Sequence, residues 1–375
     1  MIKSEYSSHT IIFHFLIVYS IFNGAIDGLQ TSDFYVNDLP LLPKNSSSIR
    51  MHAGYLPVNH QHHGALFFWH FADKSTTDKS TTVIWLAGGP GGSSIAEAWW
   101  EIGPFRFQQD GTIVKNNGSW SLFANLLFVD QPVGTGFSYI DTDSFIHDLP
   151  EMADQFLYFL DRYIEIFPEL LDEDIYLAGS SFAGQYIPYI AQAILEKRMA
   201  LKLHGLLIGN GWIDPRTTYM SYLPFAVEKN LVEKESAFYN RMSEKVKECQ
   251  EALSKKVHVL EDECELILQQ ITLDSPQTDY YAKHYKYKCM DMYNLHLANT
   301  DMNCGINKWS EEKYVTTYLQ RQDVMSRIHV DEKKVNWTDF SYSVHRSFDA
   351  RHSTPSVEFP SCSIVVNMTS FTIIE

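Results

Sequence analysis

The feature that most constrains the fold is a serine in a small-residue turn between a predicted strand and a predicted helix. Residues 174–177 (DIYL) form a short apolar segment, and residues 184–199 carry apolar side chains at helical spacing. The turn after the strand reads Gly179-Ser180-Ser181-Phe182-Ala183-Gly184. A strand, a sharp turn and a helix can present a serine hydroxyl on a tight elbow, with helix N–H groups aimed at developing negative charge. Packing is the alternative interpretation of the same small residues.

Other apolar segments alternate with helical patterns in the first part of the chain. Residues 82–86, 125–129 and 206–208 are short and continuously apolar, and residues 66–71 are rich in aromatic side chains. Helical spacing recurs over residues 149–167. Continuous apolar strands indicate a sheet buried on both faces. Their alternation with helices predicts an α/β fold with a mostly parallel central sheet and helices on both faces.

The composition fits a packed enzyme better than a nucleic-acid-binding protein. Hydrophobic residues make up 45% and charged residues 20% of the chain, which predicts a sizeable core. With 30 basic and 46 acidic residues the formal net charge is −16, which disfavours a nucleic-acid backbone as partner. No motif requires a cofactor, so none is expected.

The N-terminus resembles a secretory signal. Lys3 precedes an apolar run over residues 11–22, and Gly24 and Ala25 are small. A membrane anchor is the alternative, but spanning a bilayer takes about twenty apolar residues. We therefore expect residues 1–25 to be a cleaved signal peptide. The protein would then be secreted or reside in the lumen of the Golgi or vacuole.

Cysteines and glycosylation sequons fit that compartment. Residues 216–310 are charged and helix-prone, and predict an inserted helical cap tied by disulfides. This segment holds a cluster of four cysteines, Cys249, Cys264, Cys289 and Cys304, while Cys362 stands apart. Three pairings of the four are possible, and zinc is disfavoured because no Cys-x-x-Cys pair exists. Asn-x-Ser/Thr sequons mark four candidate glycosylation sites, Asn45, Asn117, Asn336 and Asn367.

A glycine-rich loop strengthens the interpretation of the serine turn as catalytic. The sequence WLAGGPGGSS at residues 85–94 follows the predicted strand at 82–86. Its backbone N–H groups could complete an oxyanion hole with the N–H of Phe182. A phosphate-binding loop is excluded because no Gly-Lys-Ser/Thr follows.

At these motifs the chain resembles the serine carboxypeptidase family, and within it the fungal pheromone-processing carboxypeptidases. The matching segments are WLAGGPGGSS (85–94), EIGPF (101–105), DQPVGTGFSY (130–139), GSSFAGQYIP (179–188) and LLIGNGWIDP (206–215). The resemblance covers roughly residues 33–358. It implies an α/β-hydrolase fold and substrates that are peptide or protein C-termini.

The resemblance also implies roles for individual residues. Ser181 matches the nucleophile that forms an acyl-enzyme. Gly89 and Phe182 match the two backbone donors of the oxyanion hole. Glu101 and Trp85 match residues of the pocket that binds the C-terminal carboxylate of the substrate.

Several positions depart from the family pattern. Ala87 stands where relatives have an Asn that binds the carboxylate, and Ser180 stands where they have a Glu that shares a proton with the acid matching Glu101. Without that partner, Glu101 is expected to ionise at lower pH. Gly92 stands where relatives have a half-cystine, so the glycine loop is expected to lose one tether.

The Asp and His of the family's triad have no recognisable counterpart after Ser181. Relatives carry them in motifs resembling G-D-x-D and G-H-x-V/T-P, and the resemblance fades after residue 358. The later histidines are expected to serve surface or packing roles: His204, His258, His284, His296, His329, His345 and His352. We therefore expect the C-terminal sheet strands to be missing, which leaves an unpaired apolar edge.

These expectations give the following organisation. The hydrolase domain covers residues 26–215 and resumes over 311–358, with the cap at 216–310 between them and a divergent tail at 359–375. The predicted function is a serine-type carboxypeptidase that releases C-terminal residues, basic ones by resemblance to the fungal type. The alternatives are an inactive homologue or truncated gene product that at most binds peptides, and another α/β-hydrolase chemistry. No transmembrane anchor is expected in this chain, and the oligomeric state is left open.

Overall fold

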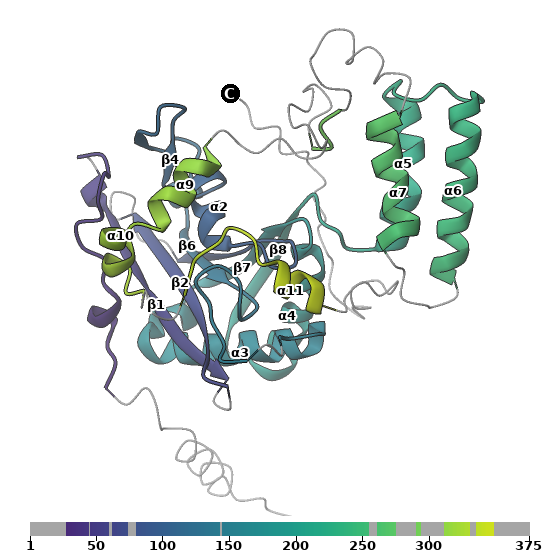
Figure 1. Cartoon of the computed structure of the whole chain (residues 1–375). Coiled ribbons are helices and arrows are strands. Elements are labelled where there is room, and N and C mark those ends of the chain that lie inside the picture. The colour runs from purple at the N-terminus through teal and green to yellow at the C-terminus, as the bar shows by residue number, and fades with distance from the viewer. Residues whose placement is uncertain are drawn as a thin grey trace, which may run out of the picture.

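A six-stranded sheet organises the chain (Figure 1). The structure, a computed structural model, describes residues 28–44, 46–59, 62–73, 80–142, 145–254, 261–274, 290–293, 311–330 and 335–348. In spatial order the strands are β1 (Ile49–Asn59), β2 (Gly64–Asp73), β6 (Asn125–Asp130), β3 (Thr81–Leu86), β7 (Asp174–Ser180) and β8 (Lys202–Gly209). A separate hairpin pairs β4 (Phe105–Phe107) with β5 (Ile113–Lys115).

The sheet is parallel where helices connect its strands. Strand β3 runs parallel to both β6 and β7, and β8 runs parallel to β7. Strands β1 and β2 form an antiparallel edge, with β2 antiparallel to β6. The predicted mostly parallel α/β sheet is confirmed. Strand β1 was not predicted, because Gly54, Pro57 and the polar His52 interrupt its apolar pattern.

Both faces of the sheet are covered, as predicted. Ile84 and Leu86 of β3 pack into the core under α3 (Leu149–Ile166) and α4 (Ala183–Lys197). Val83 and Trp85 pack into the core on the opposite face, under α2 (Ser94–Trp100), α9 (Glu312–Leu319) and α10 (Gln322–Arg327). Alternation of side chains along β3 therefore feeds two separate cores.

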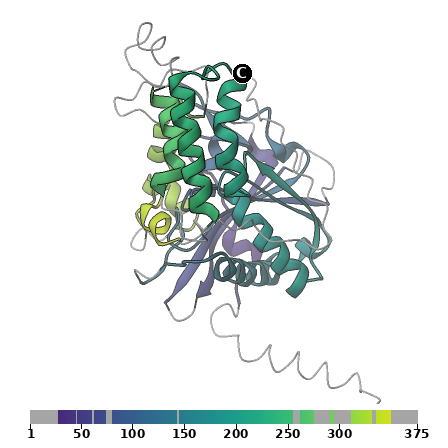
Figure 2. The ribbon, with the colours of Figure 1, turned by 90° about the vertical axis from the view of Figure 1, so that its right-hand side faces the viewer.

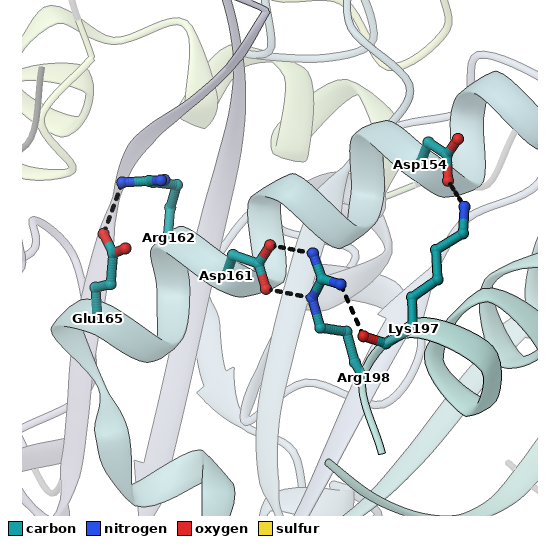
Figure 3. Close-up of polar contacts among 6 residues, drawn as sticks. All are labelled: Asp154, Asp161, Arg162, Glu165, Lys197 and Arg198. Carbon is teal, nitrogen blue, oxygen red and sulfur yellow. Dashed lines mark hydrogen bonds and ion pairs between the residues drawn. The ribbon is translucent and has the colours of Figure 1, made fainter. Parts of the chain in front are cut away.

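Helices α3 and α4 lie side by side on one face and are joined by ion pairs (Figure 3). Asp148 caps α3, with its side chain accepting a hydrogen bond from the backbone N–H of Glu151. At the other helix, Arg198 binds both carboxylate oxygens of Asp161 at 2.6 Å. Lys197 pairs with Asp154 nearby. These contacts fix the position of α4, whose N-terminus follows Ser181.

Three further helices form a cluster of their own beside the sheet. They are α5 (Pro215–Glu228), α6 (Ala237–Ser254) and α7 (Glu261–Asp274), and Figures 1 and 2 show them side by side. Their facing side chains form a separate hydrophobic core. A disulfide between Cys249 and Cys264 joins α6 to α7. The disulfide selects one of the possible pairings, while Cys289, Cys304 and Cys362 lie outside the described residues.

Strand β8 ends the sheet within the described residues, where it pairs only with β7. Leu203 and Leu206 are half-buried there, and the side chain of Leu207 is 39% exposed. This edge is as apolar as the sequence predicts. None of the helices in the described ranges has the length and apolar composition needed to cross a membrane. The predicted signal peptide, residues 1–25, lies outside those ranges.

The remaining short elements are the 3-10 helices η1 (Thr31–Phe34), η2 (Ser46–Ser48), η3 (Trp120–Leu122) and η4 (Pro168–Leu171) and the helix α11 (Tyr342–Ser347). Helix α11 matters for the site because it follows a segment that pairs with the glycine loop.

Candidate active site

Ser181 sits at the exposed tip of the turn between β7 and α4. Its backbone is left-handed, with φ of +57°, a conformation that a non-glycine residue rarely adopts. Three backbone hydrogen bonds hold it: its N–H donates to Gly209 O at 3.1 Å, and its carbonyl accepts from Gly184 N at 3.0 Å and Trp212 N at 2.8 Å. A strained serine on a strand-to-helix turn is the geometry of a nucleophile elbow.

The elbow requires a glycine two residues before the serine. A Cβ added to Gly179 would lie 2.1 Å from the carbonyl oxygen of Leu86 and 2.8 Å from the Cβ of Ala183. The second contact explains why Ala183 is tolerated where the G-x-S-x-G pattern has glycine. Because Gly179 has no side chain, there is room for the methyl group of Ala183.

The glycine loop lies directly against this elbow. A Cβ added to Gly88 would lie 2.7 Å from the backbone nitrogen of Phe182 and 2.8 Å from the Cβ of Ser181. Gly89, the next residue in the chain, has a φ of +121°. Within the described part of the chain, the backbone N–H groups of Gly89 and Phe182 donate no hydrogen bond. Both donors are therefore available beside Ser181, as an oxyanion hole requires.

A segment near the C-terminal end braces the glycine loop. Ser93 N–H donates to Asp339 O at 2.9 Å, and Ser341 N–H donates to Gly91 O at 2.8 Å. Phe340 forms an isolated β-bridge with Gly92. Gly92 stands where relatives have a half-cystine, and in this chain backbone pairing holds the loop at that point. No sequence pattern predicts this pairing. A strand can be predicted from the apolar pattern of its own residues. An isolated β-bridge such as that between Gly92 and Phe340 joins residues far apart in the sequence and has no such pattern.

Asp130 fixes the start of the helix that follows the loop. Its Oδ1 accepts from Ser93 Oγ at 2.8 Å and from Ile95 N–H at 3.1 Å, and its Oδ2 accepts from Phe137 N–H at 2.8 Å. Gly136 is required beside it, because an added Cβ would lie 2.0 Å from Oδ2. The DQPVGTGF motif therefore holds the glycine loop and α2 in register.

Trp85 and Glu101 lie on elements that flank the loop, and a third residue connects them. Trp85 is the penultimate residue of β3, and its indole Nε1 donates to Glu97 Oε2 at 2.5 Å. Glu101 follows one helical turn later, where its N–H donates to the carbonyl of Glu97 at 2.8 Å. Glu97 was missed by motif comparison. The spacing of four residues between the two acids is the signal that could have found it, once a helix is placed after the glycine loop.

Burial governs the ionisation of Glu101, and the lower pKa expected relative to relatives with a Glu at position 180 stays a prediction. Burial raises the pKa of Glu101 above its ordinary value, and Arg106 opposes that rise only in part. Burial also raises the pKa of Glu97 to about 8, with repulsion from Glu101 adding to the rise and the Trp85 hydrogen bond opposing it. The pocket is too poorly solvated for Glu101 to ionise early, even with Ser180 in place of a second acid.

None of the described histidines hydrogen-bonds to Ser181. His204 pairs with Asp174 at 3.1 Å, His329 bonds the carbonyl of Tyr35 at 3.2 Å, and the His345 ring lies 5.5 Å from the Phe340 ring. The other four candidates lie outside the described residues: His258, His284, His296 and His352. Ser181 Oγ has no hydrogen-bond partner within those ranges.

Of the four predicted glycosylation sites, the structure describes two. Asn117 and Asn336 are exposed, while Asn45 and Asn367 lie outside the described residues.

Comparisons with known proteins agree on one family. A sequence model of the serine carboxypeptidase family (Peptidase S10) matches residues 40–370. The pheromone-processing carboxypeptidase KEX1 of Tuber melanosporum is 45% identical over 336 residues, which cover 88% of this chain and 53% of that protein. The protein of the same name from Fusarium vanettenii is 44% identical, over 89% of this chain and 55% of that protein. The chain thus spans about half the length of the curated relatives it matches.

A solved structure shows the same fold. The crystal structure of Kex1(delta)p, a prohormone-processing carboxypeptidase from Saccharomyces cerevisiae, matches with a TM-score of 0.75 and 34% sequence identity. The match covers 88% of this chain and 74% of that one.

Proposed function

Because this chain belongs to the serine carboxypeptidase family, we propose that its function is to remove residues from the free C-terminus of peptides or proteins, with Ser181 as the nucleophile. The observation that carries the proposal is the left-handed backbone of Ser181, which places an exposed hydroxyl against the glycine loop. Such strain persists only where the surrounding structure enforces it, and it clusters at active sites.

The proposed chemistry is acyl transfer to Ser181. Oγ attacks the carbonyl carbon of the last peptide bond and gives its proton to a base. The N–H groups of Gly89 and Phe182 donate to the oxygen that becomes negative in the tetrahedral intermediate, and one such donor is worth about 10²–10³ in kcat. The C–N bond then breaks, the C-terminal residue leaves with a protonated amine, and water hydrolyses the acyl-enzyme.

The base is the part of this mechanism that the described residues do not supply. Ser181 Oγ has no hydrogen-bond partner among them, and a serine hydroxyl is a weak nucleophile without a base. We expect the purified 375-residue chain to show no labelling by a fluorophosphonate probe above that of the Ser181→Ala variant. Strong labelling that depends on Ser181 would mean that a base acts on it, and would overturn this part of the proposal.

The proposed substrates are peptides that end in basic residues. The resemblance to the fungal pheromone-processing type implies this preference, and the net charge of −16 supports it. A negative surface favours the approach of cationic peptides. The predicted signal at residues 1–25 and the exposed sequons at Asn117 and Asn336 support a secretory-pathway location, in which both asparagines would carry glycans.

A second candidate function is binding of peptide C-termini without turnover. The observation that favours it is that Ser181 lacks a hydrogen-bonded base among the described residues. Calorimetry at pH 6 with a peptide that ends in a free carboxylate and with its C-terminal amide tests it. The binding function predicts tighter binding of the free acid with no release of its last residue. Equal affinity for the two peptides would exclude carboxylate recognition.

A further inference from the structure

Glu97, which the family motifs do not contain, accepts a hydrogen bond from Trp85, a residue of the predicted carboxylate pocket. Its Oε2 accepts the indole N–H of Trp85 at 2.5 Å. Trp85 is the penultimate residue of β3 and lies two residues before Ala87, the position where relatives bind the carboxylate with Asn. A side chain held by Trp85 is therefore held at the pocket proposed above.

Helix α2 places Glu97 and Glu101 on one face. The helix starts at Ser94, directly after the glycine loop, and Ser93 caps it by accepting from Ala96 N–H at 3.2 Å. Residues four apart on a helix are neighbours, with Cβ atoms about 5–6 Å apart. The backbone hydrogen bond from Glu101 N–H to Glu97 O keeps that spacing up to the end of the helix.

The surroundings of the pair disfavour two charges. Glu97 feels the negative charges of Glu101 and, from β6, of Asp130. Among the described residues, the cation that acts on the pair is Arg106 of β4, which acts on Glu101. Helix α9 contacts α2 through Tyr318, whose ring lies 4.9 Å from the Trp99 ring. This contact is between two aromatic rings and places no cation beside the acids. Both glutamates are only partly accessible to water.

We propose that Glu97 is the second carboxyl group of the pocket that binds the C-terminal carboxylate of the substrate, and that it holds the single proton of the Glu97–Glu101 pair. This inference rests on the proposed function, because it concerns the same pocket. With Oε2 engaged by the Trp85 N–H, the proton lies on Oε1. From there Glu97 can donate to an oxygen of the substrate carboxylate, which is the task that Ser180 cannot perform in place of a glutamate. Glu97 is thus a substrate-binding residue on α2 rather than on the elbow.

The pH dependence follows from the sign of the shift. The pKa of Glu97 is raised to about 8, by burial first and by Glu101 second. Below that pH the acid is protonated and donates to the substrate. Above it, Glu97 loses the donor and adds a negative charge that repels the carboxylate. Affinity for a free C-terminus is therefore retained up to about pH 8 and falls above it.

Calorimetry with a free-acid peptide and its C-terminal amide, between pH 6 and pH 9.5, tests this inference. In the wild-type chain we expect the Kd of the free acid to rise about tenfold between pH 7 and pH 9, since one pH unit beyond the pKa costs a factor of ten. Glu97→Gln keeps a neutral side chain at every pH, so its Kd should change less than about threefold over that range. Glu151→Gln, at an exposed glutamate of α3, should follow the wild type.

A second measurement uses only the wild-type chain, so it does not depend on whether a variant folds. Repeating the wild-type titration at pH 9 in two buffers of different ionisation enthalpy counts the protons taken up on binding. The free acid should take up close to one proton, and the amide none. No proton uptake with the free acid would overturn the inference.

The outcomes separate this inference from the proposed function. A preference for the free acid with the same pH profile in the wild type and in Glu97→Gln would refute the role of Glu97 and leave carboxylate recognition standing. No preference for the free acid at any pH would refute carboxylate recognition, and the role of Glu97 with it.

Discussion

Backbone sterics at single residues decide the geometry around Ser181. Gly179 and Gly88 have no space for a side chain, and each of them contacts a different side of the elbow. The left-handed φ of Ser181 is held by hydrogen bonds to Gly209, Gly184 and Trp212. The exposed hydroxyl is therefore a product of close backbone approach and not of side-chain packing.

A substitution at Gly179 should destabilise the fold. In Gly179→Ala the new methyl group would lie 2.1 Å from the carbonyl oxygen of Leu86, so β3 and β7 must shift apart. We expect a loss of about 3 kcal/mol in the free energy of unfolding, measured by urea denaturation. Gly118→Ala is the control: its nearest atom is 3.6 Å away, and the change should stay within about 0.5 kcal/mol. Equal stability of the two variants would contradict this account of the elbow.

The sequence identified those site residues that lie in contiguous motifs. Ser181, Phe182 and Gly89 were assigned from residues beside them in the chain, and the structure brings them together. Glu97 was not assigned, because its partner Trp85 lies on another element and no motif links the two. The rise in the pKa of Glu101 above its ordinary value was not predicted, because the burial that causes it cannot be seen from the sequence around position 180.

At the scale of elements, helix α4 is the support of the elbow, and its link to α3 is specific. Arg198 binds Asp161 through two hydrogen bonds, whereas Lys197 and Asp154 form a single pair that is about half exposed (Figure 3). A planar guanidinium can bind a carboxylate in this two-point manner and an ammonium group cannot.

The two pairs should differ in their contribution to stability. Arg198→Ala should lower the free energy of unfolding by about 1 kcal/mol, a modest value because the Asp161–Arg198 pair is about one-third exposed. Lys197→Ala should cost less than about 0.5 kcal/mol. Arg198→Lys should not restore the loss. The measurement is thermal or urea unfolding at low salt, and an equal effect of Lys197→Ala would speak against the two-point contact.

The α5–α7 cluster depends on its disulfide more than the sheet does. We propose that residues 216–310 form a cap, supported by the separate hydrophobic core of these helices. Cys249 and Cys264 are 15 residues apart, and closing a loop of that size contributes about 3 kcal/mol. Replacing both by Ala should lower the hydrogen-exchange protection of α6 and α7 while α3 keeps its own. Equal loss of protection in α3 would show that the cluster is not an independent unit.

Elements were predictable where their own pattern is regular. The parallel strands β3, β6 and β7 are continuous apolar segments and were located closely. Strand β1 was missed, because its pairing with β2 compensates for Gly54 and Pro57, and such compensation exists only in the assembled sheet. The β-bridge at Phe340 was missed for the same reason.

For the whole molecule, the edge of β8 and the net charge act in opposite directions. Within the described residues β8 pairs on one side only, and such an edge with exposed Leu207 favours edge-to-edge association, while a net charge of −16 opposes it. Leu207→Lys should reduce self-association, measured by light scattering at a fixed protein concentration. In the wild-type chain, raising the salt should increase association, because it screens the repulsion. Salt-independent scattering that Leu207→Lys does not change would exclude this edge as the contact.

The central claim, which we propose, is that the described residues place Ser181 beside two oxyanion-hole donors but supply no base for it. The most direct test is labelling by a fluorophosphonate probe with and without added imidazole, a diffusible base, read out by mass spectrometry of the Ser181 peptide. We predict no labelling without imidazole, labelling that rises with imidazole concentration, and none in Ser181→Ala under either condition. Labelling of Ser181 without imidazole, or its absence at high imidazole, would contradict the claim.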